Sequence, residues 1–256
     1  MSRATTAVVW LVQQTSGENA RLHVLKELFV EDTESGIPDE VALLASQSHP
    51  FILPVVEVIK APKGPVAMVT EYCDQGDLFS LLADLRKGGG RVPESQVLSW
   101  LAELSLALSH LHKQHILHRD VKTSNIFVTA DCTLKLGDFG LARTWQSEES
   151  ITSRVGSPFY MSPEICLHNP YGSASDLWSL GCVLYEIICL TPAFYADSIA
   201  ALLHRICNVT YDPPPPGSCS DLLRELLGSL LQREASARPS AHEVRTAALA
   251  LAIFVQ

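Results

Sequence analysis

The chain has 256 residues, of which 47% are hydrophobic and 18% are charged, so it can bury a large core and is not a disordered chain. Its 19 Lys and Arg residues against 28 Asp and Glu residues give a net charge of −9, which argues against a nucleic-acid partner. The longest apolar run, residues 247–255, is far shorter than the roughly 18 residues that span a bilayer. We therefore expect no membrane partner.

The N-terminal part of the chain predicts strands with one helix among them. Residues 8–12 and 22–26 are short apolar or alternating runs that predict two strands. Residues 38–46 predict a helix with Pro38 in its first turn. Residues 53–60 and 66–70 are again typical of strands.

Helices dominate from Leu78 onward. The spacing of the apolar residues between 97 and 111 gives one buried helix face, formed by Val97, Leu101, Leu104, Leu108 and Leu111. Residues 177–190 are apolar almost all round and predict a helix inside the core. Residues 213–216 are four prolines and predict a stiff extended connector, with a partner-binding motif as the alternative. Residues 247–255 predict a terminal helix.

The seven cysteines are scattered and form no CxxC pair. The N-terminus also lacks the apolar core and small-residue cleavage site of a signal peptide. Both features favour a reducing, intracellular and cytoplasmic location.

Polar residues typical of phosphoryl transfer lie in the middle of the chain. The segment HRDVKTSN spans residues 118–125, and DFG follows at residues 138–140. Asp120 would orient an attacking hydroxyl, and Lys122 would neutralise charge on the moving phosphoryl group. Asp138 and Asn125 offer the oxygen ligands that Mg²⁺ prefers.

These motifs, in this order, resemble those of the eukaryotic protein kinases. A Pro-Glu pair ending at Glu164 lies downstream in GSPFYMSPE, and Lys122 is typical of the Ser/Thr class. The strings HILHRDVKTSNIF and GSPFYMSPEIC are similar to those of the NIMA-related (Nek-type) kinases. Within this resemblance, Ser157 would pack near Asp120, Asp176 would hold the catalytic loop, and Arg238 would pair with Glu164.

The resemblance implies an α+β, two-lobed protein-kinase fold that covers residues 1–256 as a single domain. A small β-rich lobe and hinge would span residues 1–73, with its first strand incomplete, and a helical lobe would span residues 74–256. It further implies ATP and Mg²⁺ as cofactors, and protein substrates that bear Ser or Thr.

The same resemblance assigns a nucleotide site. Lys26 would bind phosphate and pair with Glu40, although only 14 residues separate them. The alternatives are that Glu40 is an acid favoured by the helix dipole and that Lys26 is a solvated charge at a strand end. The remaining residues implied at the nucleotide are Val9, Val24 and Phe127 around the base, Thr70 at the back pocket, Glu71, Tyr72 and Cys73 in the hinge, and Asp77 at the ribose.

The glycine-rich loop of the family is missing. Ser2, Ala4 and Ala7 stand where its glycines are expected, and alanine cannot replace a glycine at φ > 0 without strain. Either the start of the chain is truncated or alternative, or the loop has degenerated. The rival to an active kinase is therefore a pseudokinase or truncated isoform that acts as a binding scaffold.

Arg119, directly before Asp120, implies regulation by phosphorylation of the loop after DFG, by an activating kinase or by autophosphorylation in trans. Ser153 is the favoured acceptor, followed by Thr152, with Ser147 and Ser150 as further candidates and an ordinary polar loop as the alternative. The family also implies an association with the cytoskeleton or the cell cycle.

Four histidines at positions 110, 112, 115 and 118 raise a second rival, a zinc-dependent hydrolase. Their spacing does not bring the side chains onto one face. Ordinary histidines at a helix end, with His118 packed inside, are the favoured interpretation.

Overall fold

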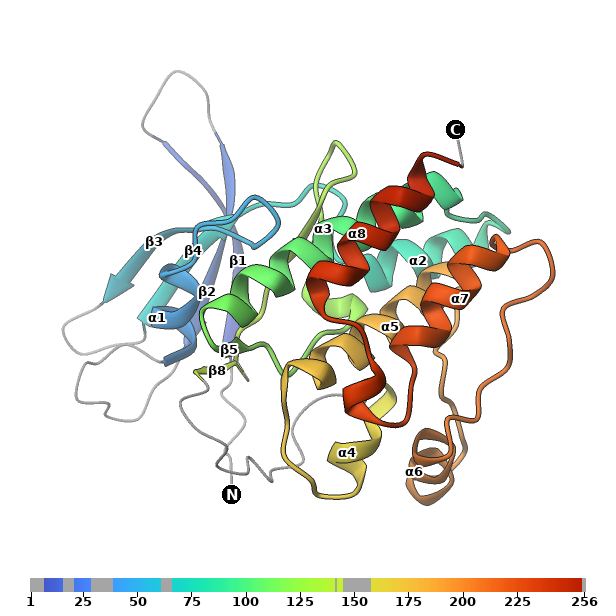
Figure 1. Cartoon of the computed structure of the whole chain (residues 1–256). Coiled ribbons are helices and arrows are strands. Elements are labelled where there is room, and N and C mark those ends of the chain that lie inside the picture. Colours follow the sequence, from blue (N-terminus) through green and yellow to red (C-terminus); the bar gives the residue numbers. More distant parts are fainter. Residues whose placement is uncertain are drawn as a thin grey trace.

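The computed structural model describes residues 7–15, 21–28, 39–60, 66–140, 142–144 and 158–254. A small β-sheet with one helix is followed by a larger, mainly helical part (Figure 1). The expected α+β class and two-lobed fold are thereby confirmed.

The N-terminal sheet is antiparallel with strand order β1-β2-β4-β3. Val9 lies opposite Lys26, and Val24 lies opposite Thr70. Because side chains alternate along a strand, Val9, Val24 and Lys26 share one face of the sheet. The strands are β1 (Ala7–Gln13), β2 (Leu22–Leu28), β3 (Val55–Lys60) and β4 (Val66–Glu71).

The strand predicted from residue 53 begins two residues later than expected. The Leu53 amide donates 2.9 Å to the Leu136 carbonyl, so this backbone joins the helical part instead of the sheet. The predicted helix after residue 38 is α1 (Asp39–Ala45), whose Val41 and Leu44 are buried in the core.

The helical part surrounds α5, which is buried along almost its whole length, as its apolar sequence predicts. The short strands β6 and β7 form a hairpin. The polar segment 118–125 precedes β6, and DFG at 138–140 follows β7. The helices are α2 (Leu78–Lys87), α3 (Glu94–Lys113), α4 (Pro163–Cys166), α5 (Ser173–Cys189), α6 (Ile199–Cys207), α7 (Asp221–Leu230) and α8 (Ala241–Ala252), and the short strands are β5 (Ile116–Leu117), β6 (Ile126–Val128), β7 (Leu134–Leu136) and β8 (Arg143–Thr144).

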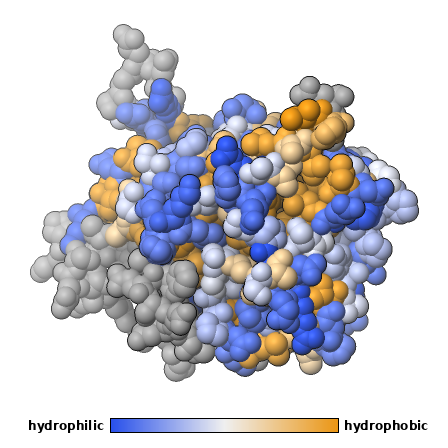
Figure 2. Space-filling view, in the orientation of Figure 1, coloured by the Kyte–Doolittle hydropathy of each residue, from blue (hydrophilic) through white to orange (hydrophobic). Residues whose placement is uncertain are grey.

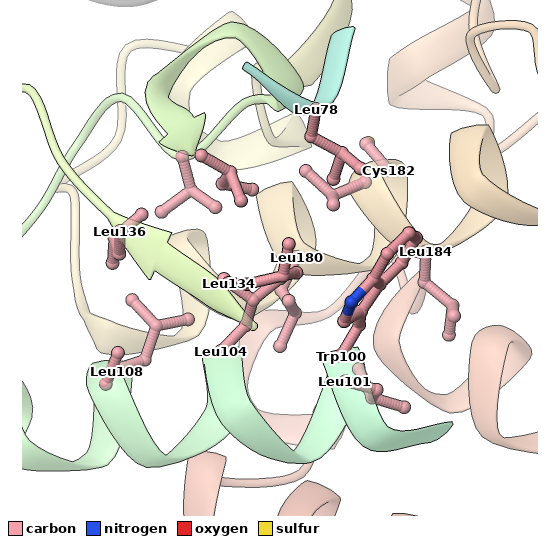
Figure 3. Close-up of a cluster of buried hydrophobic side chains, with 14 of the residues drawn as sticks. Leu78, Trp100, Leu101, Leu104, Leu108, Leu134, Leu136, Leu180, Cys182 and Leu184 are labelled. Atoms are coloured by element: carbon pink, nitrogen blue, oxygen red, sulfur yellow. The ribbon is translucent and has the colours of Figure 1, made fainter. Parts of the chain in front are cut away.

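The core lies where α3, α5 and the β6–β7 hairpin meet. Leu104 and Leu108 of α3 lie beneath Leu134 and Leu136 of β7, with Leu180 of α5 beside them (Figure 3). All five residues of the predicted α3 face are buried. Burying each such leucine contributes about 1.5–3 kcal/mol to the stability of the fold. This packed layer therefore holds β6 and β7, and the polar loops next to them, in place.

The terminal helix differs from its prediction at both ends. It begins at Ala241 because the Ser240 hydroxyl accepts from the Glu243 amide at 3.3 Å while the Glu243 carboxylate accepts from the Ser240 amide at 2.8 Å, a capping box. It ends at Ala252, and Ile253 and Phe254 are 72% and 77% exposed. Figure 2 shows an apolar patch on this face of the molecule. Across the described ranges, no helix has the length and apolarity needed to cross a membrane.

Candidate active site

Three predicted catalytic residues meet in the loop between β5 and β6. The Lys122 ammonium lies 2.6 Å from Asp120 Oδ2, and Asn125 Nδ2 donates 2.9 Å to the same oxygen and 2.9 Å to the Asp120 carbonyl. Within the described part of the chain, Oδ1 of Asp120 accepts no hydrogen bond. The carboxylate is therefore held from one side, and its other oxygen is left to meet a hydroxyl.

Asp176, near the start of α5, anchors the backbone of this loop. Its carboxylate accepts hydrogen bonds from the backbone amides of His118 at 3.1 Å and Arg119 at 3.0 Å. It also bonds His112 Nε2 at 2.8 Å and the Tyr171 hydroxyl at 2.7 Å. Complete burial by itself would raise the pKa of Asp176, but His112 and the other donors outweigh it and lower the pKa, so the group is an ionised anchor.

His118 joins this loop to the DFG segment. Its Nδ1 accepts from the Asp120 amide at 3.3 Å, and its Nε2 lies 3.0 Å from the Gly137 carbonyl. Burial lowers the pKa of His118, which keeps the ring neutral with the proton on Nε2. The ring also meets Phe139 edge-on at 5.0 Å between centroids.

Two residues at the same place have a strained backbone. Arg119 has φ 68° and Asp138 has φ 56°, the left-handed region that residues other than glycine rarely adopt. Such strain persists only where surrounding bonds hold it, as Asp176 holds Arg119. The Arg119 guanidinium lies 5.8 Å from the centre of the Tyr171 ring.

Lys26 reaches the DFG segment from the sheet. Its Nζ lies 3.5 Å from Asp138 Oδ1, with side chains 26% and 41% exposed. The expected partner Glu40 lies in the first turn of α1, and its side chain is outside the described residues. The structure thus brings Lys26 to Asp138, and it leaves the pairing with Glu40 a prediction.

The donor set beside Asp120 fits Mg²⁺. Asp138 presents a partly exposed carboxylate. Because the side-chain nitrogen of Asn125 donates both hydrogen bonds to Asp120, Oδ1 of Asn125 faces away from Asp120. Carboxylate and amide oxygens are the protein ligands that Mg²⁺ takes alongside water and phosphates.

The residues predicted around the base come from both parts of the chain. Val9 is 62% exposed, Val24 is half-buried and Thr70 is buried in the sheet. Phe127 comes from β6 in the helical part, and a Cβ added to Gly137 would lie only 2.8 Å from its ring. The ring is therefore pressed against the backbone just before Asp138.

The hinge residues have side-chain partners that the sequence did not indicate. Glu71 Oε2 lies 3.0 Å from the Lys135 ammonium, which also donates 3.2 Å to the Pro50 carbonyl. Asp77 is the N-cap of α2 and accepts from the Ser80 amide at 2.8 Å. Cys73 is 5% exposed, and burial together with Glu71 raises its pKa to about 12, so its thiol is buried and protonated.

Glu164 and Arg238 pair as the resemblance implied. Arg238 donates two bonds of 2.8 Å, one to each carboxylate oxygen, and Ser175 Oγ donates a third at 2.6 Å. Burial by itself would raise the pKa of Glu164, but the Arg238 and Ser175 bonds outweigh it and lower the pKa. The Arg238 guanidinium also lies 5.0 Å from the Trp178 ring.

The sequence interpretation missed a further buried carboxylate, Glu186. The Tyr160 hydroxyl donates 2.5 Å to Glu186 Oε2, and Thr123 Oγ1 donates 3.2 Å to the same oxygen. Burial raises the pKa of Glu186, and the hydrogen bonds from Tyr160 and Thr123 offset only part of this rise. An acid in the apolar run that follows Asp176 in α5 was the available signal, because a buried carboxyl group requires partners.

The expected regulatory residues Thr152 and Ser153, the further acceptors Ser147 and Ser150, and Ser157 lie outside the described residues. So do Ser2 and Ala4, and the side chain of Ala7 is likewise not described.

The histidines of the proposed zinc site have separate partners. His110 bonds Gln114 at 2.7 Å, His112 bonds Asp176, and His118 bonds Gly137. No group of three or more metal-binding side chains converges within the described ranges.

A family model for the protein kinase domain matches residues 4–249. The chain belongs to the protein kinase family. This kinase domain is 40% identical over 236 residues to mouse serine/threonine-protein kinase Nek1. The aligned region covers 90% of this chain and 19% of Nek1. The chain is 38% identical over 233 residues to mouse Nek3, covering 90% of this chain and 44% of Nek3. For mouse Nek4 the identity is 36% over 231 residues, covering 88% of this chain and 29% of Nek4. The chain thus spans less than half the length of these relatives. Protein kinases use ATP and Mg²⁺.

Proposed function

We propose that this kinase domain transfers the γ-phosphate of ATP to Ser or Thr hydroxyls of protein substrates, as a Nek-type enzyme. The observation that carries the proposal is the convergence of Lys122 and Asn125 on one oxygen of Asp120. The similarity to three Ser/Thr kinases of the Nek group supports the choice of hydroxyl.

Asp120 orients the substrate. Its Oδ1 accepts a hydrogen bond from the Ser or Thr hydroxyl, which aims the oxygen at the γ-phosphorus. As the new P–O bond forms, the bond to the β-phosphate oxygen breaks and ADP leaves. The hydroxyl proton passes to Asp120, and Lys122 offsets negative charge on the transferred group.

Lys26 and Asp138 hold the nucleotide's phosphate end. Asp138 and Asn125 Oδ1 would bind Mg²⁺, which neutralises charge on the phosphates. Lys26, now 3.5 Å from Asp138, would contact the phosphates from the sheet, with Glu40 as its expected partner.

The rest of the nucleotide would lie between Phe127 and the shared face of the sheet that carries Val9 and Val24. Backbone groups of Glu71 and Cys73 would bond the base, Thr70 would limit the back pocket, and Asp77 would add a bond to ribose. The division of one domain into residues 1–73 and 74–256 follows from this placement.

Regulation and location are part of the same proposal. Phosphate on Ser153 or Thr152, added in trans or by an activating kinase, would pair with Arg119, and Ser157 would pack near Asp120. We further propose a cytoplasmic location and protein substrates that bear Ser or Thr.

The test is phosphoryl transfer from labelled ATP–Mg²⁺ to a mixed Ser/Thr substrate pool. Asp120→Asn and Asp138→Ala should each lose the signal, and the exposed Asp84→Asn should keep it as the control. Transfer by wild type no greater than by folded Asp120→Asn protein would refute the proposal. A binding scaffold would then be the remaining function, supported by a thermal shift with ATP–Mg²⁺ but no turnover.

A further inference from the structure

Four successive prolines, residues 213–216, lie in the connector between α6 and α7. Figure 1 shows this connector as a long trace without helix or strand, at the side of the helical part away from the N-terminal sheet. Pro214 is buried, whereas Pro213, Pro215 and Pro216 are exposed. Nothing in the proposed phosphoryl transfer uses this segment.

The backbone of the four prolines is a polyproline II helix. Each ring holds φ near about −65°, and a residue that precedes a proline is confined to extended ψ values, which covers the first three of the four. Pro216 is the second residue of a turn that closes where the Ser218 amide donates 3.0 Å to the Pro215 carbonyl. Gly217, the third residue, has φ 73°, which identifies a type II turn. In that turn the second residue stays extended, so the conformation continues through Pro216.

The protein holds one edge of this helix and leaves another open. Polyproline II has about three residues per turn, so Pro213 and Pro216 share one edge. Pro214 lies on a different edge, where its ring is buried and its carbonyl accepts 2.7 Å from Arg224. The carbonyls of Pro213 and Pro216 accept no hydrogen bond from any residue in the described ranges. Their shared edge therefore offers apolar rings and free acceptors together.

Charged side chains at the two ends give the helix a direction. Asp212 precedes the prolines, with its side chain 93% exposed and its carboxylate 3.9 Å from Arg205. Arg91, an exposed residue just before α3, donates 3.3 Å to the Gly217 carbonyl at the other end. An acid at one end and a cation at the other complement a partner in one orientation only.

A stiff connector needs the fixed φ of proline, but it needs neither exposed rings nor free carbonyls beside them. Because the rings have already fixed the backbone, this segment loses little conformational entropy when it binds a partner. Grooves lined by aromatic side chains take up segments of this conformation.

We propose that residues 213–216 bind the aromatic-lined groove of a partner protein, of the kind that SH3, WW and EVH1 domains present. The exposed proline rings lie between aromatic side chains of the groove, whose N–H or O–H groups donate to the carbonyls of Pro213 and Pro216. A basic group of the partner lies near Asp212, and an acidic group lies near Arg91. The proposal does not depend on the proposed kinase function.

Direct binding without ATP tests the proposal. The probes are purified SH3, WW and EVH1 domains immobilised as an array, to which the fluorescently labelled chain is added. Wild type should bind a subset of these domains, and a free peptide of residues 211–218 should displace it. Titration of the domain that binds best then gives a Kd for each variant.

Two variants locate the contact. Pro215→Ala/Pro216→Ala should raise this Kd about tenfold, because two rings lose their contacts, and Pro170→Ala, at an isolated exposed proline, should not. Arg91→Glu should raise it about fivefold, whereas Lys113→Glu, which reverses an exposed charge on α3, should leave it unchanged. Circular dichroism of each variant should match that of wild type, so that a higher Kd reports a lost contact.

Failure of wild type to bind any of the domains would overturn the proposal. So would a Kd that Pro215→Ala/Pro216→Ala leaves unchanged, or binding that the free peptide does not displace. Phosphoryl transfer to the mixed Ser/Thr pool should be equal for wild type and this double variant. A failure of the docking segment is therefore distinguishable from a failure of the proposed kinase function.

Discussion

Lys26 Nζ lies 3.5 Å from Asp138 Oδ1, so a cation on β2 meets the carboxylate that follows β7. This contact joins the sheet to the loop beside Asp120. Two groups of opposite charge are thereby held in contact at the site that we propose for the phosphates and Mg²⁺.

Replacing Lys26 should remove phosphate contacts without unfolding the protein. For Lys26→Met we expect kcat/KM for ATP to fall about a hundredfold or more, as is usual when a charged group at the phosphates is lost. The free energy of unfolding should change by less than about 1 kcal/mol, because the pair is partly exposed. Steady-state kinetics and urea unfolding measure the two effects, with Lys113→Met as the control. Unchanged kinetics would show that Lys26 is only a strand-end charge.

Arg238 should be a stability residue. In Arg238→Ala the buried Glu164 carboxylate loses both bonds of its bidentate partner, and we expect a loss of about 3–5 kcal/mol in the free energy of unfolding. Arg238→Lys should also lose stability, because one ammonium cannot replace the planar fork. Urea unfolding measures both, and Arg233→Ala, at an exposed position nearby, should match wild type. Equal midpoints for Arg238→Ala and wild type would contradict this account.

Glu186 should make stability fall with rising pH. Burial raises its pKa above the usual 4.5, so the folded state holds this proton at pH values where the unfolded state has released it. Its stabilising contribution is present below pH 4.5 and is lost as pH rises through the folded pKa. Glu186→Gln keeps an oxygen acceptor for Tyr160 and Thr123 and removes the ionisation. The free energy of unfolding, measured against pH, should therefore fall less steeply for this variant. Exposed Glu225→Gln is the control, and identical slopes for the two variants would disprove the role.

Gly137 should be intolerant of a methyl group. Its added Cβ would lie 2.8 Å from Phe127 Cε2 and 3.2 Å from Leu53 Cδ2. Gly137→Ala should lower the free energy of unfolding by about 1–3 kcal/mol and raise the KM for ATP, because the Phe127 ring must move. Gly228→Ala in α7, which has no atom within 4 Å of its added Cβ, should instead gain about 0.5–1 kcal/mol. Thermal unfolding and ATP kinetics of both variants provide the comparison, and a KM unchanged in Gly137→Ala would separate Phe127 from the nucleotide.

Local pattern was enough for much of the fold. The spacing from Val97 to Leu111 predicted the buried face of α3, and the apolar run after Asp176 predicted the central helix α5. The ends of the helices and strands could not be predicted in the same way, because individual hydrogen bonds decide where an element begins and ends. Ser240 and Glu243 moved the start of α8 upstream, and the Leu53–Leu136 bond removed two residues from β3.

The sequence by itself determined the proposed catalytic set, because Asp120, Lys122 and Asn125 lie in one short loop whose residue types and spacing are typical of phosphoryl transfer. It also determined which helices are buried, since periods of 2 and 3.6 residues decide which side chains share a face. Only the tertiary structure decided that Lys26 meets Asp138, that Lys135 links Glu71 to Pro50, and that Tyr160 and Thr123 satisfy Glu186. These partners lie far apart along the chain, and their approach depends on how whole elements pack against the shared core, which no local repeat of side chains encodes.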